Sequence, residues 1–167
     1  MYSILILDVS GSMIGYYQSL INMANNIIKK QQVNQENEGV VIFFGSNAKA
    51  TINGKYRLLN TGDINLAGVG RGTNFYCAFQ EAKKYIYNKS NFSNKRILFL
   101  TDGGADSSRL QPMCDEMIKE KFLINIVGFG NGSYFEHLRK FASQNCFFTS
   151  TNFKEVEIIC QNIFAAE

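Results

Sequence analysis

The sequence predicts an α/β domain with a doubly wound, mostly parallel six-stranded sheet, one antiparallel edge strand and helices on both faces. Short β-branched or aromatic runs alternate with longer segments of helical period, as they do in βαβ units. The four strongest runs are continuously apolar, which is typical of strands that are buried on both faces. The 167 residues contain no internal repeat, linker or break in composition, so we interpret residues 1–167 as a single domain.

Six segments are predicted to be strands. The four strong runs are, in chain order, Ser3–Leu7, Val40–Phe44, Ile97–Leu100 and Leu123–Phe129. Two weaker runs are Lys49–Ile52 and Cys146–Thr149. The first weak run follows Val40–Phe44 after a short turn that contains Gly45, Ser46 and Asn47. So short a connection indicates a hairpin, and Lys49–Ile52 is therefore the expected antiparallel edge strand.

Five segments are predicted to be helices. In chain order they are Tyr17–Lys30, Phe75–Asn88, Arg109–Lys121, Tyr134–Ser143 and Phe153–Ala166. The apolar residues of the clearest segments recur at the i, i+3, i+4 spacing of an amphipathic helix. In the last segment this stripe consists of Val156, Ile159, Cys160, Ile163 and Phe164. We expect that stripe to pack on the sheet.

Composition and charge exclude several classes of protein. The chain is 46% hydrophobic with 14 Phe and 8 Tyr, which is enough for a sizeable core. Its net charge of +3 is too mild to indicate a nucleic-acid partner or an anionic membrane surface. No apolar run approaches the roughly 20 residues that a membrane-spanning helix needs. We therefore expect neither nucleic acid nor membrane as a partner.

The cysteines and the first residues favour a cytoplasmic location. Four cysteines lie far apart without a CxxC pair, at positions 77, 114, 146 and 160, and we interpret them as buried free thiols. The segment 1–8 lacks the basic region and the cleavage site of a secretory signal. Free thiols are typical of a reducing compartment.

The residues that catalysis commonly uses are sparse. His137 is the only histidine, with no evident acidic partner, so a serine hydrolase triad is not indicated. No Gly-x-Ser-x-Gly motif occurs. The glycine-rich runs 68–72 and 128–132 lack the last glycine of a dinucleotide-binding loop, and no Walker lysine is present. The sequence therefore predicts that the protein is not an enzyme.

Polar residues gather just after the predicted strands. Asp8, Ser10 and Ser12 follow the first strand, and Asp102 follows the third strong run. Thr73 stands at the end of a glycine-rich loop, directly before a predicted helix. In an open parallel sheet, ligands bind at the carboxyl ends of the strands, so these five side chains form a candidate site.

This set of carboxylates and hydroxyls contains no thiol or imidazole. All-oxygen ligand sets suit a hard divalent cation, Mg²⁺ or Mn²⁺, better than zinc. Each residue alone could have an ordinary structural role: Ser12 or Thr73 as a helix cap, Asp8 or Asp102 as part of a turn. Independent caps and turns have no reason to meet at the ends of neighbouring strands, so the joint pattern predicts a bound cation.

These motifs resemble those of the von Willebrand factor type A (vWA) domain over essentially the whole chain. The matching features are Asp-Val-Ser-Gly-Ser-Met at positions 8–13, Gly-Thr at 72–73 and Thr-Asp-Gly at 101–103. The resemblance implies a Rossmann-like fold and an intact metal-ion-dependent adhesion site (MIDAS). In such a site Ser10, Ser12 and Thr73 ligate the ion, Thr73 directly or through water. Asp8 and Asp102 ligate it or hold its waters.

The resemblance also implies a function: a protein partner contributes a carboxylate to the open position of the metal. The alternatives are a structural subunit of a larger complex with a purely stabilising metal, and a metal-dependent phosphotransfer or nucleotide-handling enzyme that uses Asp8 as nucleophile. The surroundings favour a partner surface, because aromatic and arginine side chains are common interface anchors. This rim consists of Tyr16, Tyr17, Arg71, Asn74, Tyr76, Asp106 and Arg109.

Overall fold

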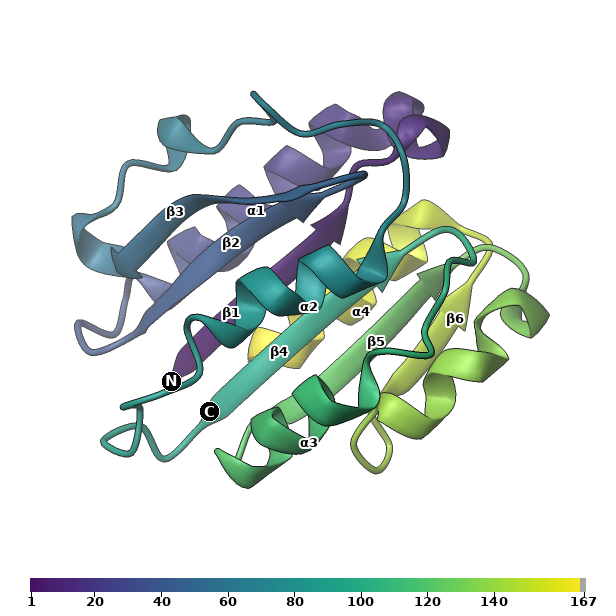
Figure 1. Cartoon of the computed structure of the whole chain (residues 1–167). Coiled ribbons are helices and arrows are strands. Elements are labelled where there is room, and N and C mark those ends of the chain that lie inside the picture. Colours follow the sequence, from purple (N-terminus) through teal and green to yellow (C-terminus); the bar gives the residue numbers. More distant parts are fainter. Residues whose placement is uncertain (166–167) are drawn as a thin grey trace.

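A computed structural model describes residues 1–165 of the chain and contains one six-stranded sheet of order β3-β2-β1-β4-β5-β6 (Figure 1). The strands are β1 (Tyr2–Asp8), β2 (Glu38–Phe44), β3 (Ala48–Lys55), β4 (Lys95–Thr101), β5 (Leu123–Phe129) and β6 (Phe147–Ser150). All neighbouring pairs are parallel except β2 and β3, which form the expected antiparallel hairpin. The predicted fold class is thereby confirmed.

Helices cover both faces of this sheet. The α-helices are α1 (Tyr17–Gln31), α2 (Phe75–Lys83), α3 (Gln111–Lys119) and α4 (Phe153–Ala165). The 3₁₀ helices are η1 (Gly11–Tyr16), η2 (Tyr56–Leu58), η3 (Thr61–Asp63) and η4 (Gly132–Phe141). Figure 1 shows α2 and α3 on one face and α1 and α4 on the other.

The predicted helix over Tyr134–Ser143 is the 3₁₀ helix η4 (Gly132–Phe141) rather than an α-helix, and it ends two residues earlier than predicted. Its buried residues Phe135, Leu138 and Phe141 are spaced by three, which fits the three residues per turn of a 3₁₀ helix. The ring of Phe135 lies where a side chain on Gly128 would be, so η4 packs closely on β5. Tertiary packing selects the tighter helix here.

The bounds of other predicted helices also differ, since the predicted Tyr17–Lys30 is α1 to Gln31 and the predicted Arg109–Lys121 is α3, Gln111–Lys119. The predicted helix Phe75–Asn88 ends as α2 at Lys83, and Asn88 has a φ of 60°, the left-handed conformation of a tight reversal. The predicted last helix is α4, of which Ala166 lies outside the described residues.

The core has one layer on each side of the sheet, because successive residues of a strand point to opposite faces. In β1, Ile4 and Ile6 belong to the layer under α2 and α3, whereas Leu5 and Leu7 belong to the layer under α1 and α4. An aromatic cluster anchors the start of α2: the ring of Phe99 lies 5.1 Å from that of Phe75 and 4.9 Å from that of Phe79. Because Phe75 is held in this way, the loop that precedes it also has a defined end point.

All four cysteines are free thiols. Cys114 and Cys160 are buried as expected, but Cys77 and Cys146 are half-buried, so the prediction was wrong for these two. Cys77 lies in the first turn of α2, and Cys146 directly precedes the edge strand β6, where less chain covers them. Among the helices of residues 1–165, none combines the length and apolar character that crossing a bilayer requires.

Candidate metal site at the carboxyl edge of the sheet

The sheet brings the two predicted acidic residues to the same edge. Strands β1 and β4 are parallel neighbours in which Leu7 pairs with Leu100. The residues that follow, Asp8 and Thr101, therefore end their strands side by side, and Asp102 comes next. No feature of the sequence near position 8 indicates this neighbour, because strand order is a property of the tertiary structure.

Asp8 is fully buried, and both of its carboxylate oxygens accept hydrogen bonds. Oδ1 accepts from the backbone N–H of Ser10 at 2.8 Å, and Oδ2 accepts from Thr101 Oγ1 at 2.7 Å. This carboxylate thus ties the β1 turn to β4. Thr101 was not among the predicted site residues, although the Thr-Asp-Gly motif that it opens was the available signal.

The two serines of the β1 turn face each other. Ser10 Oγ and Ser12 Oγ lie 3.2 Å apart, with Ser10 buried and Ser12 exposed. The phenol of Tyr17 donates hydrogen bonds to the carbonyls of Val9 at 2.6 Å and Ser10 at 3.1 Å. Tyr17, expected at the rim, therefore holds the backbone of the β1 turn from the start of α1.

Hydrogen bonds attach the glycine-rich loop on both sides of Thr73. The N–H of Gly11 donates to the carbonyl of Arg71 at 2.8 Å, and the N–H of Asn74 donates to the carbonyl of Gly45 at 2.8 Å. The side chain of Asn74 then caps α2 by accepting from the N–H of Cys77 at 3.0 Å. These bonds place the exposed Thr73 between the β1 turn and the helix start.

Within residues 1–165, Asp102 has a buried oxygen without a hydrogen-bond partner and a raised pKa. Its Oδ1 is a buried side-chain atom without a hydrogen-bond partner in the described part of the chain. Burial raises the pKa of Asp102 above its ordinary value, and the nearby Asp8 adds to this effect, while the Ser12 hydroxyl opposes it. Buried polar atoms almost always have a partner, so this orphaned oxygen indicates an absent positive charge or donor.

The donor chemistry at this edge fits a hard divalent cation. Within residues 1–165 no group of three or more His, Cys, Asp or Glu side chains comes together, so a cation would depend on hydroxyl oxygens as well as on two carboxylates. Contacts link Asp8, Ser10 and Ser12, and Asp102 is close enough to Ser12 and Asp8 for both to affect its pKa. The placement of Thr73 rests on its backbone alone.

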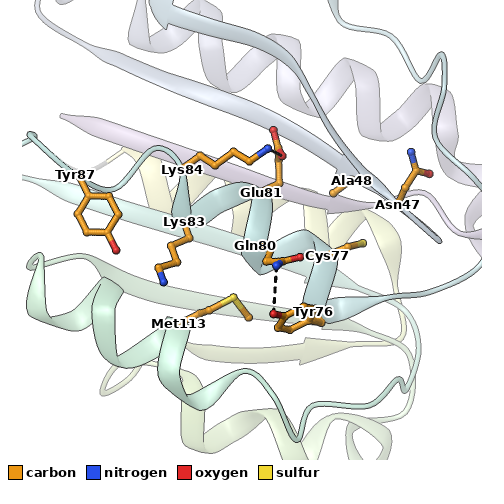
Figure 2. Close-up of a pocket in the computed structure, with 10 residues that line it drawn as sticks. All are labelled: Asn47, Ala48, Tyr76, Cys77, Gln80, Glu81, Lys83, Lys84, Tyr87 and Met113. Carbon is orange, nitrogen blue, oxygen red and sulfur yellow. Dashed lines mark hydrogen bonds and ion pairs between the residues drawn. The ribbon is translucent and has the colours of Figure 1, made fainter.

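Two hollows lie near this edge, on the side of α2. A small pocket of about 260 Å³ adjoins Thr73 and is walled by Tyr76 and Arg109. A larger hollow of about 740 Å³ runs along α2 and contains none of the five predicted site residues. Figure 2 shows Tyr76 at the boundary of the larger hollow, where Gln80 Nε2 donates to its hydroxyl at 3.2 Å.

The lone histidine lacks the surroundings of a catalytic base. His137 Nδ1 and Ser107 Oγ are 2.8 Å apart, and the imidazole faces the ring of Phe75 with 6.5 Å between the ring centroids. No carboxylate of residues 1–165 hydrogen-bonds to this ring. The arrangement does not form a hydrolase triad.

Comparison with known proteins supports the same fold. The sequence profile of the von Willebrand factor type A domain matches residues 4–163. No curated protein sequence is significantly similar to the chain.

Three solved structures illustrate the similarity. Proximal thread matrix protein 1 from the mussel byssus, whose MIDAS motif is occupied by zinc, is 18% identical with a TM-score of 0.76, over 98% of this chain and 44% of that one. The SpRpn10 VWA domain is 17% identical with a TM-score of 0.68, over 94% and 93% of the two chains. The pilus adhesin SpaC from Lactobacillus rhamnosus GG is 12% identical with a TM-score of 0.77, over 98% and 29%. This chain thus spans less than half of the mussel protein and of the adhesin.

Proposed function

This chain belongs to the von Willebrand factor type A family, and we propose that it is a protein-interaction module in which a divalent cation, Mg²⁺ or Mn²⁺, binds an acidic side chain of a partner protein. Domains of this family commonly act as interaction modules. The observation that carries the proposal is the orphaned, buried Oδ1 of Asp102, a residue whose pKa is affected by the Ser12 hydroxyl, which in turn lies 3.2 Å from that of Ser10. A cation at this place would give that oxygen the positive charge it lacks.

The residues have separate parts in this proposal. Ser10, Ser12 and Thr73 supply hydroxyl ligands, and Asp102 ligates the ion or holds one of its waters. Asp8 holds the turn in place through Ser10 and adds a second negative charge. With so few direct carboxylates, a bound Mg²⁺ retains waters, and the chemistry that it supplies is an exchangeable position for a carboxylate oxygen.

The similar structures support a metal and an interaction role in general terms. The mussel protein holds zinc in its MIDAS motif, and SpaC is an adhesin. We propose Mg²⁺ or Mn²⁺ rather than zinc for this chain because its donor set contains only oxygen. The four free cysteines support a cytoplasmic location.

The phosphotransfer alternative is not favoured by the geometry. Its nucleophile would be Asp8, which is fully buried and accepts a hydrogen bond at each oxygen. Because the side chain is fully buried, a phosphodonor in solvent does not reach it. The alternative of a purely stabilising metal in a subunit of a larger complex is separated from an interaction role by two experiments.

The first experiment measures metal binding through stability. Mg²⁺ at a hundredfold excess over its dissociation constant would stabilise the native chain by about 2.7 kcal/mol. For a domain of this size that raises the melting temperature by about 5–11 °C. Asp102→Asn removes the charge that the ion needs, so this variant would lose most of the rise. Asp63→Asn makes the same charge change on the exposed helix η3 and would keep it. An equal rise in all three proteins, or in none, would contradict a cation at this site.

The second experiment measures the interaction. A short, flexible Gly/Ser peptide with a single glutamate would shift amide resonances of the β1 turn in Mg²⁺ and leave them unchanged in EDTA. The same peptide with glutamine is the control. Metal-dependent stability without any peptide-induced shift would favour the purely stabilising role.

A further inference from the structure

The small pocket beside Thr73 has the features of a binding site for one side chain. It lies between the start of α2 and the segment 105–109, and its volume is about 260 Å³. Pockets for small-molecule ligands usually measure ~300–1,000 Å³, so this one suits a single side chain better than a nucleotide. Because Thr73 lines it, the pocket adjoins the proposed metal site directly.

Arg109 forms one wall of this pocket and stacks on Tyr76. Its guanidinium carbon lies 3.5 Å from the centroid of the Tyr76 ring, the geometry of a close cation–π stack. The Tyr76 hydroxyl is held in turn by Gln80 at 3.2 Å. A stacked guanidinium keeps its N–H edges available in one plane, so little conformational entropy remains to be lost when it binds a carboxylate.

The charge of Arg109 is not neutralised by an ion pair. Within residues 1–165 its guanidinium forms no salt bridge and donates no hydrogen bond. The polar interaction that it does form is the cation–π contact with Tyr76. The neighbouring Asp106 also lines the pocket, but its Oδ1 accepts from the N–H of Ser108 at 2.9 Å. The pKa of Asp106 is lowered mainly by its bonds with Ser108 and less by the charge of Arg109. The guanidinium donors thus remain free for a ligand.

We propose that this pocket binds a second carboxylate of the same partner segment whose first carboxylate reaches the metal, so that the partner is an acidic peptide with two acidic residues close together in sequence. This inference rests on the proposed function. Guanidinium and carboxylate match in a bidentate pair, which is the strong form of such a contact. A phosphate dianion fits less well, because Asp106 adds a negative charge to the same wall.

The test compares one-glutamate and two-glutamate peptides. The probes are Gly/Ser peptides with a single glutamate, or with two glutamates separated by zero to four residues, titrated in Mg²⁺ and followed by the amide resonances of the β1 turn and of α2. The best two-glutamate peptide should bind about tenfold more tightly than the single-glutamate peptide, which corresponds to about 1.4 kcal/mol for the added charge-assisted pair.

Three variants assign this gain to the pocket. Arg109→Gln should abolish the tenfold difference between the two peptides, while binding of the single-glutamate peptide still requires Mg²⁺. Arg57→Gln removes the same charge from an exposed position of η2, beyond the end of β3 that pairs with the start of β2, and should keep the difference. Asp106→Asn removes the competing negative charge without removing the oxygen that Ser108 binds, and should increase the difference.

The outcomes separate the two proposals. If two-glutamate peptides bind no better than the single-glutamate peptide, or if Arg109→Gln retains the gain, the second carboxylate site is refuted while the metal-dependent module stands. If neither peptide binds in a Mg²⁺-dependent manner, the proposed function fails and this inference fails with it.

Discussion

The hydrogen bond from Thr101 to Asp8 allows a quantitative test of how the metal site is built. Thr101 is fully buried, and its Oγ1 donates to Asp8 Oδ2 at 2.7 Å while accepting a longer bond from the N–H of Gly103 at 3.3 Å. Thr101→Val keeps the shape of the side chain and removes the donor. A lost hydrogen bond to a charged group costs about 1.5–3 kcal/mol. For a domain of this size the melting temperature should fall by about 3–12 °C.

The assay is urea unfolding followed by circular dichroism, with EDTA and then with Mg²⁺. Thr101→Val should lower the midpoint without changing the slope, because the exposed area on unfolding is the same. It should also weaken the stabilisation by Mg²⁺, because Asp8 is no longer oriented by β4. Thr101→Ser keeps the donor and loses one methyl group, at a cost of about 1 kcal/mol, so it should retain the Mg²⁺ effect. If Thr101→Val is no less stable than Thr101→Ser and responds equally to Mg²⁺, the role assigned to this bond is refuted.

Two further predictions concern the support of the site and the last helix. In Gly45→Ala the new Cβ would lie 1.8 Å from a backbone carbonyl oxygen of the glycine-rich loop, so this variant should lose about 1–3 kcal/mol in thermal unfolding. Gly103→Ala meets open space and is the matched control; an equal loss in both would contradict the close packing of the loop. Arg96→Met removes the guanidinium that donates to the Ile163 carbonyl in the last turn of α4. The free energy for opening this turn should then fall by about 0.5–1.5 kcal/mol. Hydrogen exchange of the amides of α4 measures this change. Unchanged exchange would show that this bond does not hold the helix end.

The strands and the fold class could be predicted because burial on both faces leaves a strong signal in the sequence. Continuous apolar runs as short as Val40–Phe44 are typical of buried strands, and the short turn after that run determined its antiparallel partner. The type of the helix over residues 132–141 could not be read in the same way. Apolar residues three apart occur in α-helices and 3₁₀ helices alike, so their spacing in the sequence does not distinguish the two.

In the candidate site, too, contacts within one segment could be predicted from the sequence, whereas contacts between distant segments could not. Asp8, Ser10 and Ser12 lie in one turn, so the local sequence was enough to predict that they are close together; contacts link them, and their joint role in a metal site stays a prediction. The other two predicted residues belong to distant segments, and the place of Thr73 relative to the metal stays a prediction. The cysteine interpretation failed at Cys77 and Cys146 because local apolar neighbours do not reveal which side of an element is covered.

The sequence by itself determined the fold class and the chemical type of the site, because both follow from local patterns: the period of apolar residues and the oxygen donors that follow the strands. The tertiary structure alone decided which of these groups carry an unbalanced charge. Burial beside Asp8 leaves one oxygen of Asp102 without a partner in the described part of the chain, and the guanidinium of Arg109 stacks on Tyr76 without forming a salt bridge there. Desolvation and the lack of a neutralising neighbour depend on chain segments that meet only on folding, so no linear pattern contains them.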